Sequence, residues 1–368
     1  MKRLFTALLS LLLLTGCTPA PTQEELNRKQ IDTLMASMTM EEKVGQLFYA
    51  RCPDVDAVAD AANFHLGGYL LFKRDIKDKS AAELQAYIQA FQSAAEIPLL
   101  IGVDEEGGTV ARVSANPQLR PERFSSPQKL FEEGGMDAIL KETVEKDALL
   151  HSLGFNLNMA PVADVCTDPE AFIYDRTFGQ DGLATANYIE QVTAQMAEDN
   201  MGSVLKHFPG YGHNPDTHTG VAVDHRTLEA FRKSDFLPFQ LGLEGAQGKA
   251  AVLVSHTFIS AVDSERPASL SPAVHQLLRE ELNFDGVVMT DDLAMEGADL
   301  RGYSAAVLAL QAGNDLVLTS SHRRDIAEVL AALESGTLSP EIVDTACRRV
   351  LVWKQALGLL GSPNPDKA

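Results

Sequence analysis

The segment between residues 206 and 220 concentrates side chains that can transfer protons. It reads Lys-His-Phe-Pro-Gly-Tyr-Gly-His-Asn-Pro-Asp-Thr-His-Thr-Gly, which is typical of a strand end followed by a loop. Asp216 and His218 are two residues apart, so the carboxylate can orient the imidazole and stabilise its cation. A histidine beside a carboxylate suits a general acid or base. A metal site is the alternative, although metal-binding histidines usually come from one helix face or from separate strands.

Seven short apolar runs along the chain end on polar residues. Such runs are typical of strands that are buried on both faces of a parallel sheet. The strands predicted in this way cover residues 68–72, 98–103, 155–162, 203–205, 250–254, 286–290 and 316–318. The polar residues that follow them include Lys73, Asp104, Asp164, Lys206, His207, His256, Asp291 and Asp292. We interpret His256 as a core histidine whose polar atoms are hydrogen-bonded, and we leave it out of the site.

Helical patterns alternate with these runs, for example at residues 41–48, 80–95 and 272–282. Thr39 and Glu42 have the spacing of a capping box. The alternation indicates βαβ units, and we predict a single-domain α/β fold, a slightly irregular TIM-type (β/α)8 barrel with one strand not located. A doubly wound open sheet would alternate in the same way. The number of units and the polar strand ends favour the closed barrel, whose chemistry lies at the carboxyl ends of the strands.

Five segments, in order, resemble the motifs of glycoside hydrolase family 3 in its β-N-acetylhexosaminidase branch. The resemblance runs from about Thr39 to Leu360. The segments are Val103-Asp104-Glu105-Glu106-Gly107-Gly108 with Arg112, Asn158 to Asp164, Arg176-Thr177-Phe178-Gly179, Lys206-His207-Phe208-Pro209-Gly210 with Asp216-Thr217-His218, and Phe284 to Gly297 with Asp291-Asp292-Leu293.

The resemblance implies a retaining hydrolysis in two steps. Asp291 would form a covalent glycosyl-enzyme, while His218, partnered by Asp216, would protonate the leaving oxygen and then activate water. This division agrees with the need for one ionised carboxylate at the anomeric carbon and one proton donor. By the same resemblance, the sugar's hydroxyl groups and acetamido arm would be held by Asp104, Arg112, Arg176, Lys206 and His207.

Some of the charged residues in these motifs can have a structural role. Asp292 is interpreted as structural, capping the following helix or bonding the loop backbone. Asp104, Lys206 and Arg176 could instead form a buried ion network that merely closes the top of the barrel.

The sequence departs from the family pattern at three places. Thr109 stands where the family often has Arg, Tyr211 stands where it has His, and the Asp-Thr-His motif comes one position early. We expect these changes to affect substrate preference more than reaction type. Many β-glucosidases of the family take their acid/base carboxylate from an additional C-terminal domain. Here the sequence ends soon after a helical pattern at residues 343–357, so we expect the loop to supply the acid/base.

The N-terminal residues predict export and lipid attachment. Lys2 and Arg3 precede an apolar run over residues 4–14 that is too short to span a bilayer, which is typical of a secretory signal. Leu14-Thr15-Gly16-Cys17 resembles the lipobox of bacterial lipoproteins. We therefore predict a signal peptide over residues 1–16, a lipidated Cys17 with a flexible tether over 17–30, and the catalytic barrel over 31–368. A plain signal peptide with a chance cysteine is the alternative.

The net charge and the cysteine content limit the kinds of partner and bound group that we expect. The formal net charge is −20, and removal of Lys2 and Arg3 with the signal gives 29 − 51 = −22. An acidic chain does not favour nucleic acid, and it leaves an acyl anchor to hold the protein at the membrane. Cys52, Cys166 and Cys347 are few and widely spaced, so we expect small buried side chains instead of disulfides or zinc ligands. We expect no cofactor or metal, and a monomer.

The function predicted from these observations is removal of terminal β-linked N-acetylglucosamine from cell-wall fragments or related oligosaccharides. One alternative is a phosphorylase on the same fold, since a histidine acid/base tolerates an incoming phosphate better than a carboxylate does. Another is a sugar-binding lipoprotein that serves a transporter. That alternative predicts two lobes with a hinge and gives no reason for the Lys-His and Asp-x-His motifs.

Overall fold

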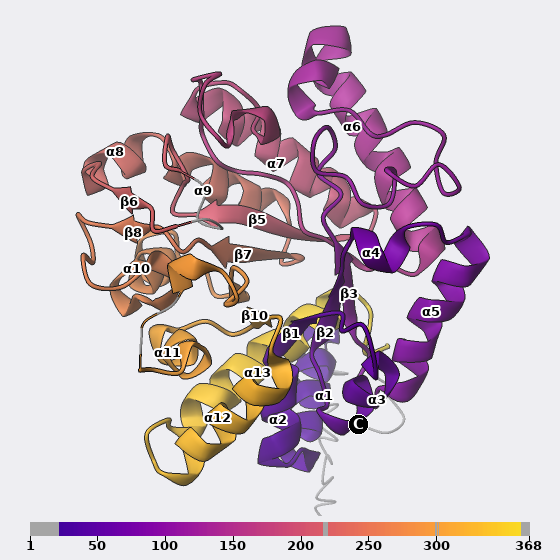
Figure 1. The fold of residues 1–368 in the computed structure, drawn as a ribbon, viewed down its shortest axis with the longest axis vertical. Coiled ribbons are helices and arrows are strands. Elements are labelled where there is room, and N and C mark those ends of the chain that lie inside the picture. The colour runs from indigo at the N-terminus through magenta and orange to yellow at the C-terminus, as the bar shows by residue number, and fades with distance from the viewer. Residues whose placement is uncertain (1–21, 216–219, 299, 301, 362–368) are drawn as a thin grey trace, which may run out of the picture.

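Eight parallel strands form one sheet in the order β10-β1-β2-β3-β4-β5-β7-β9 in the computed structural model, which describes residues 22–215, 220–298, 300 and 302–361 (Figure 1). Met289 pairs with Leu316, just before β10, and this contact closes the sheet into a barrel. The predicted (β/α)8 barrel is therefore confirmed. The strands are β1 (Phe48–Arg51), β2 (Gly68–Leu71), β3 (Leu100–Val103), β4 (Leu157–Asn158), β5 (Gly202–Phe208), β7 (Ala250–Val254), β9 (Val288–Thr290) and β10 (Val317–Thr319).

Helices surround the barrel (Figure 1), and most of those in the described part of the chain begin at a Ser, Thr or Asp whose side chain accepts a backbone N–H. None of the described helices is long and apolar enough to cross a bilayer. A small sheet pairs β6 (Val223–Asp224) with β8 (Phe258–Ile259). The helices are α1 (Gln23–Ser37), α2 (Met40–Gln46), α3 (Ala57–Asn63), α4 (Lys73–Ile76), α5 (Ala81–Ala94), α6 (Pro127–Leu153), α7 (Gly182–Glu198), α8 (Leu228–Lys233), α9 (Phe236–Gly245), α10 (Pro272–Gln276), α11 (Ala305–Ala312), α12 (His322–Glu334) and α13 (Pro340–Ala356).

Two sequence expectations about the N-terminal part are wrong. The first is the helix expected over residues 41–48, which ends at Gln46. The residues after it form β1, the strand that was not located in the sequence. Only one residue separates this helix from the four-residue strand β1, and the apolar pattern of the helix continues into the strand. The boundary between them is therefore not visible in the sequence. Residues 23–30, expected in the tether, lie in α1 instead, where Thr22 and Glu25 form a capping box. The capping box at Thr39 and Glu42 is confirmed.

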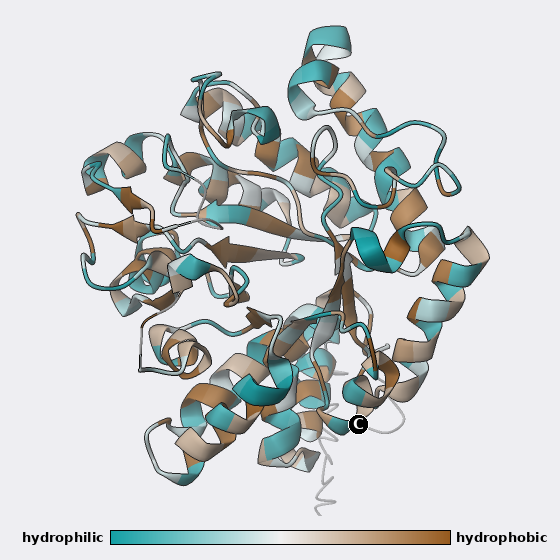
Figure 2. Cartoon of the chain, viewed as in Figure 1, coloured by the Kyte–Doolittle hydropathy of each residue, from teal (hydrophilic) through white to brown (hydrophobic). Residues whose placement is uncertain are grey.

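Apolar side chains fill the barrel interior. Tyr49, Leu100, Leu157, Leu253 and Met289 belong to one buried cluster, and most of the strand ribbon is coloured hydrophobic (Figure 2). Tyr49 reaches across the interior so closely that a Cβ on Gly102 would lie 2.0 Å from its hydroxyl oxygen. This strand position therefore requires glycine.

The C-terminal helix supplies the floor of the barrel. Val350, Trp353 and Leu357, at the end of α13, belong to the same cluster as the interior strand residues. Lys354, fully buried, donates from Nζ to Oε1 of Gln46 at 2.7 Å and so ties α13 to α2. A packed interior with a closed floor leaves the carboxyl ends of the strands as the open end of the barrel.

Candidate active site

A cavity of about 460 Å³ lies at the carboxyl ends of the strands. Its walls include Phe172, which is 47% exposed, and Met295, besides the ends of β1 and β2. The structure brings together six of the residues predicted from the sequence, which all line this cavity: Asp104, Arg112, Arg176, Lys206, His207 and Asp291. The six residues therefore lie together at the carboxyl ends of the strands, where the sequence placed the candidate site.

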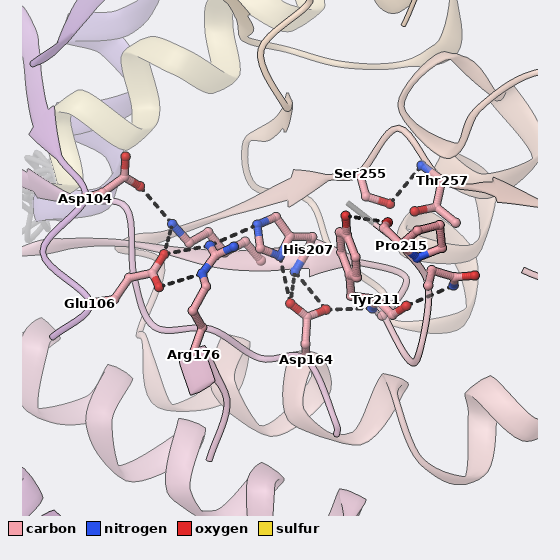
Figure 3. A network of polar contacts seen from close by, with 12 residues as sticks. Asp104, Glu106, Asp164, Arg176, His207, Tyr211, Pro215, Ser255 and Thr257 are labelled. Atoms are coloured by element: carbon pink, nitrogen blue, oxygen red, sulfur yellow. Dashed lines mark hydrogen bonds and ion pairs between the residues drawn. The ribbon is translucent and has the colours of Figure 1, made fainter. Parts of the chain in front are cut away.

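A buried ion network borders the cavity, and Figure 3 shows its polar contacts. Lys206, at 3% exposure, places Nζ 2.8 Å from Oδ1 of Asp104 and 2.6 Å from Oε1 of Glu106. Arg176 donates to both oxygens of Glu106, from Nε at 2.9 Å and from Nη2 at 2.8 Å. The ion network that the sequence left as an alternative does exist, and because Asp104, Lys206 and Arg176 line the cavity it also presents polar groups to a ligand.

The carboxylates and cations of this network stabilise one another's ionised forms. Burial opposes ionisation of Glu106, but Arg176 and Lys206 outweigh it and hold the pKa of Glu106 below its ordinary value. Burial favours neutral Lys206, but Asp104 and Glu106 outweigh it and raise the pKa of Lys206. The lysine is therefore a fixed cation at neutral pH. An ammonium has three donors, and two are directed to the carboxylates, so the third can serve a hydroxyl group of a ligand.

His207 is held by a second buried carboxylate, Asp164 (Figure 3). Oδ2 of Asp164 lies 2.7 Å from Nδ1 of His207, and the same carboxylate accepts the backbone N–H groups of His207 and of Tyr211, the latter at 2.7 Å. Nη2 of Arg176 lies 3.4 Å from Nε2 of His207. The donors and acceptors assign the proton to Nδ1 and make Nε2 an acceptor, so the ring is fixed in orientation and tautomer.

Asp291 and Asp292 follow β9 and have different surroundings. The backbone N–H of Asp291 donates to the Val254 carbonyl at 3.1 Å, and its Oδ1 accepts the N–H of Asp292 at 2.9 Å. Asp292 accepts the N–H of Ala294 at 3.0 Å and the hydroxyl of Ser320 at 2.9 Å. Asp292 therefore bonds the loop backbone, as predicted, while Asp291 lines the cavity wall.

His256 is the buried core histidine that the sequence suggested. Its Nε2 donates to the Asp292 carbonyl at 3.0 Å, and Nδ1 lies 2.6 Å from the Ser269 hydroxyl. It supports the loop that carries the two aspartates.

Asp216 and His218 lie outside the described residues, but the start of their loop is firmly anchored. Tyr211 donates its hydroxyl to the Pro215 carbonyl at 3.0 Å and so shapes the loop. Arg226 donates to the Gly210 carbonyl at 3.2 Å and to both oxygens of Asp235 at 2.9 Å. Gly210 has φ +129°, and a Cβ there would lie 2.3 Å from Asp235, so only glycine fits.

Arg112 is placed by a carboxylate that faces away from the network. Glu105, fully buried, accepts the backbone N–H groups of Arg112 at 2.8 Å and Val113 at 2.7 Å. Within the described residues, the Arg112 guanidinium forms neither an ion pair nor a hydrogen bond, which leaves its donors to a ligand.

Residues 39–352 match the glycosyl hydrolase family 3 N-terminal domain. The chain belongs to glycosyl hydrolase family 3. It is 35% identical over 287 residues to a β-hexosaminidase of Thiobacillus denitrificans, covering 75% of this chain and 77% of the relative. It is 32% identical over 314 residues to a β-hexosaminidase of Glaesserella parasuis, covering 82% and 88%.

Solved structures of family 3 proteins share this fold. A family 3 β-N-acetylglucosaminidase from Paenibacillus superimposes with a TM-score of 0.80 at 30% identity, covering 88% of this chain and 63% of that one. A β-N-acetylhexosaminidase from Beutenbergia cavernae superimposes with a TM-score of 0.74 at 29% identity, covering 87% and 99%. The family resemblance read from the motifs is confirmed, and the protein is a glycoside hydrolase of family 3.

Two residues that hold side chains of the candidate site were not assigned from the sequence. Glu106 lies within the motif Val103 to Gly108, but the sequence analysis predicted no role for it. In the structure it is the centre of the ion network. Asp164 was recognised only as the residue after a strand, and it orients His207. Both are charged residues within three positions of the end of a predicted strand, and that position was the available signal.

A group of possible metal ligands lies elsewhere in the described part of the enzyme. Glu42, His65 and Glu96 offer ligand atoms within 4.8 Å of one another. They precede β1, β2 and β3, so they lie at the amino ends of the strands, away from the cavity. Cys52, Cys166 and Cys347 are free and buried, as expected.

Proposed function

We propose that this family 3 enzyme is a retaining, exo-acting β-N-acetylhexosaminidase that removes terminal β-linked N-acetylglucosamine through a covalent glycosyl-enzyme. The observation that carries the proposal is that Asp291 lines the same cavity as Asp104, Lys206 and Arg176, which the buried Glu106 joins into one ion network. Small-molecule sites range over about 300–1,000 Å³, so a cavity of this size suits a terminal sugar better than a long chain. The β-hexosaminidase relatives support this substrate class.

In this mechanism, Asp291 attacks the anomeric carbon while the leaving oxygen takes a proton from His218. Water then attacks the same carbon, gives a proton to His218 and releases Asp291, so the anomeric configuration is retained. Asp216 stabilises the imidazolium. Asp104 and Lys206 bind hydroxyl groups on the terminal sugar, and Arg112, Arg176 and His207 complete its binding.

Hydrolysis is tested by the product formed. We expect the purified enzyme to release N-acetylglucosamine from an aryl β-N-acetylglucosaminide and from β-linked disaccharides, with the β-anomer formed first in an NMR time course. Added phosphate should change neither the rate nor the product. Formation of N-acetylglucosamine 1-phosphate would identify a phosphorylase, and intact substrates would exclude both activities.

We expect His218→Ala to affect substrates according to their leaving groups. Hydrolysis of a disaccharide, whose leaving oxygen needs a proton, should slow by about 10²-fold or more. Cleavage of a dinitrophenyl glycoside, which needs no protonation, should lose much less in kcat/KM, and added azide should restore turnover by replacing water.

The matched control is His213→Ala in the same loop. His213 is exposed and faces Asp168 at 3.3 Å, and it does not line the cavity. Its loss should leave both rates near the wild-type values. Equal losses on both substrates in His218→Ala would assign the proton transfer to another group.

Export and anchoring through Cys17 remain part of the proposal, and they rest on the sequence of residues 1–17, which lie outside the described residues. An anchor at Cys17 followed by a short connection to α1 would place the site at the cell envelope, where cell-wall fragments are available as substrates. Metabolic labelling with a fatty acid in a bacterial host tests this, since Cys17→Ser should abolish the label.

A further inference from the structure

Arg51 contributes a cation to the cavity that the mechanism does not use. It is the last residue of β1 and lines the cavity together with Phe72 and Asp104. Its guanidinium carbon lies 4.2 Å from the centroid of the Phe72 ring, so the planar group rests on an aromatic side chain. Nε is shielded from solvent and has no hydrogen-bond partner, and within the described part of the chain no carboxylate pairs with Arg51.

The carboxylates near Arg51 are engaged by other groups. Asp75 accepts the backbone N–H of Phe72 at 2.8 Å and faces Arg74 at 3.4 Å. Arg74 in turn pairs with Asp54 at 2.7 Å. Asp104 is bound to Lys206. Arg74 and Lys206 thus form close ion pairs within the described residues. Arg51 forms none there: burial raises the pKa of Asp75, and Arg51 opposes this only through a longer-range attraction.

A half-buried guanidinium without an anion is costly, because desolvation is not offset by a partner. Its position on the cavity wall means that a ligand can supply the missing charge. The planar donor fork, held against Phe72, is suited to a carboxylate, sulfate or phosphate oxygen pair. Since Nε is shielded, the terminal nitrogens of the guanidinium are the donors that a ligand meets.

We propose that Arg51 forms an anion subsite and that the preferred substrate carries a negatively charged group beside the hexosamine linkage. The proposal rests on the proposed glycosidase function and adds to it the charge of the substrate. The anion belongs either to the terminal sugar or to the sugar that leaves. Arg51 then determines specificity, while Asp104, Lys206 and Arg176 bind the neutral hydroxyl groups.

The test compares substrates that differ only in the anion. One pair is an aryl β-N-acetylglucosaminide and its 6-sulfate, which places the anion on the terminal sugar. The other is N-acetylglucosamine β-linked to N-acetylglucosamine or to N-acetylmuramic acid, whose carboxylate lies on the leaving sugar. We expect the wild-type enzyme to prefer the anionic member of one pair, and that pair locates the anion.

Variants at Arg51 should change this preference. Arg51→Met removes the charge and should lower the ratio of anionic to neutral kcat/KM by about 10- to 100-fold, which corresponds to one lost charge-assisted contact. Arg51→Lys should recover part of the ratio, since it keeps the charge without the fork. Arg74→Gln removes a neighbouring charge that already has partners in the protein, and it should leave the ratio unchanged.

Two results would overturn the proposal. One is a wild-type enzyme without preference in either pair. The other is an Arg51→Met variant that loses neutral and anionic substrates equally, which would mean that Arg51 only balances the acidic residues of the cavity. Calorimetric binding of the four sugars to Asp291→Asn, with and without Arg51→Met, gives the same comparison without turnover. The failure of glycosidase activity is thereby distinguished from the failure of the subsite.

Discussion

Replacing Asp291 with asparagine is expected to lower kcat by at least about 10³-fold, because a carboxamide cannot form the glycosyl ester. Its oxygen can still accept the N–H of Asp292, which now lies 2.9 Å from Oδ1, so the fold and the affinity for sugar should survive. The measurement is kcat for a disaccharide together with thermal unfolding of both proteins. A slow fluorinated substrate should leave a covalent sugar on wild-type Asp291, detectable by peptide mass mapping.

Asp292→Asn is the matched control for this prediction. Asp292 bonds Ala294 and Ser320 and supports the loop, so its amide should retain much more activity than the amide at Asp291. A mapped label on Asp292, or equal losses in the two variants, would reverse their roles.

Glu106→Ala is expected to have the largest effect on stability. It leaves the buried charges of Lys206 and Arg176 without their shared partner, and breaking a buried pair in this way costs about 3–5 kcal/mol of the free energy of unfolding. Activity should fall as well, because Lys206 and Arg176 lose the group that fixes them at the cavity wall. Urea unfolding and kcat/KM are the two measurements.

The pH dependence of this effect follows from the lowered pKa of Glu106. A carboxyl whose folded pKa is depressed stabilises the protein fully above its unfolded pKa, about 4.3, and loses that contribution as pH falls through the folded value. The difference in stability between wild type and Glu106→Ala should therefore stay constant from about pH 6 to pH 8 and shrink only in acid.

A surface pair provides the control for stability. Glu145, whose side chain is 57% exposed, lies 2.9 Å from Arg120, and Glu145→Ala should cost less than about 1 kcal/mol. If Glu106→Ala were no more destabilising than this variant, the ion network would carry little of the fold's stability.

Asp104, Glu105 and Glu106 show that the positions of site residues could be predicted from the sequence more readily than their contacts. Apolar runs that end in charged residues were sufficient to place Asp104, Lys206 and Asp291 at one end of a barrel. The roles of the two glutamates depend on contacts across the fold. Glu106 meets Lys206 and Arg176, while Glu105 binds the backbone at 112–114.

Alternation along an extended chain would have distinguished the two glutamates, because residues 104 and 106 project to one side and 105 to the other. The pairing of Asp164 with His207 has no such local signal, since it joins two different strand ends. Arg51 was missed for another reason. Its strand, β1, follows α2 so closely that the carboxyl end of that strand was not identified.

The position of α13 at the floor of the barrel also affects when the barrel can form during protein synthesis. β1 pairs with β10, and Trp353 seals the interior, so the first and last parts of the chain must both be present before the barrel can close. Such pairing between distant segments is slow, since the loop-closure entropy comes before the contacts are made. A ribosome therefore releases almost the whole polypeptide before Arg51 and Asp291 can share one cavity. Until that moment the residues of the candidate site cannot be assembled at one end of the barrel.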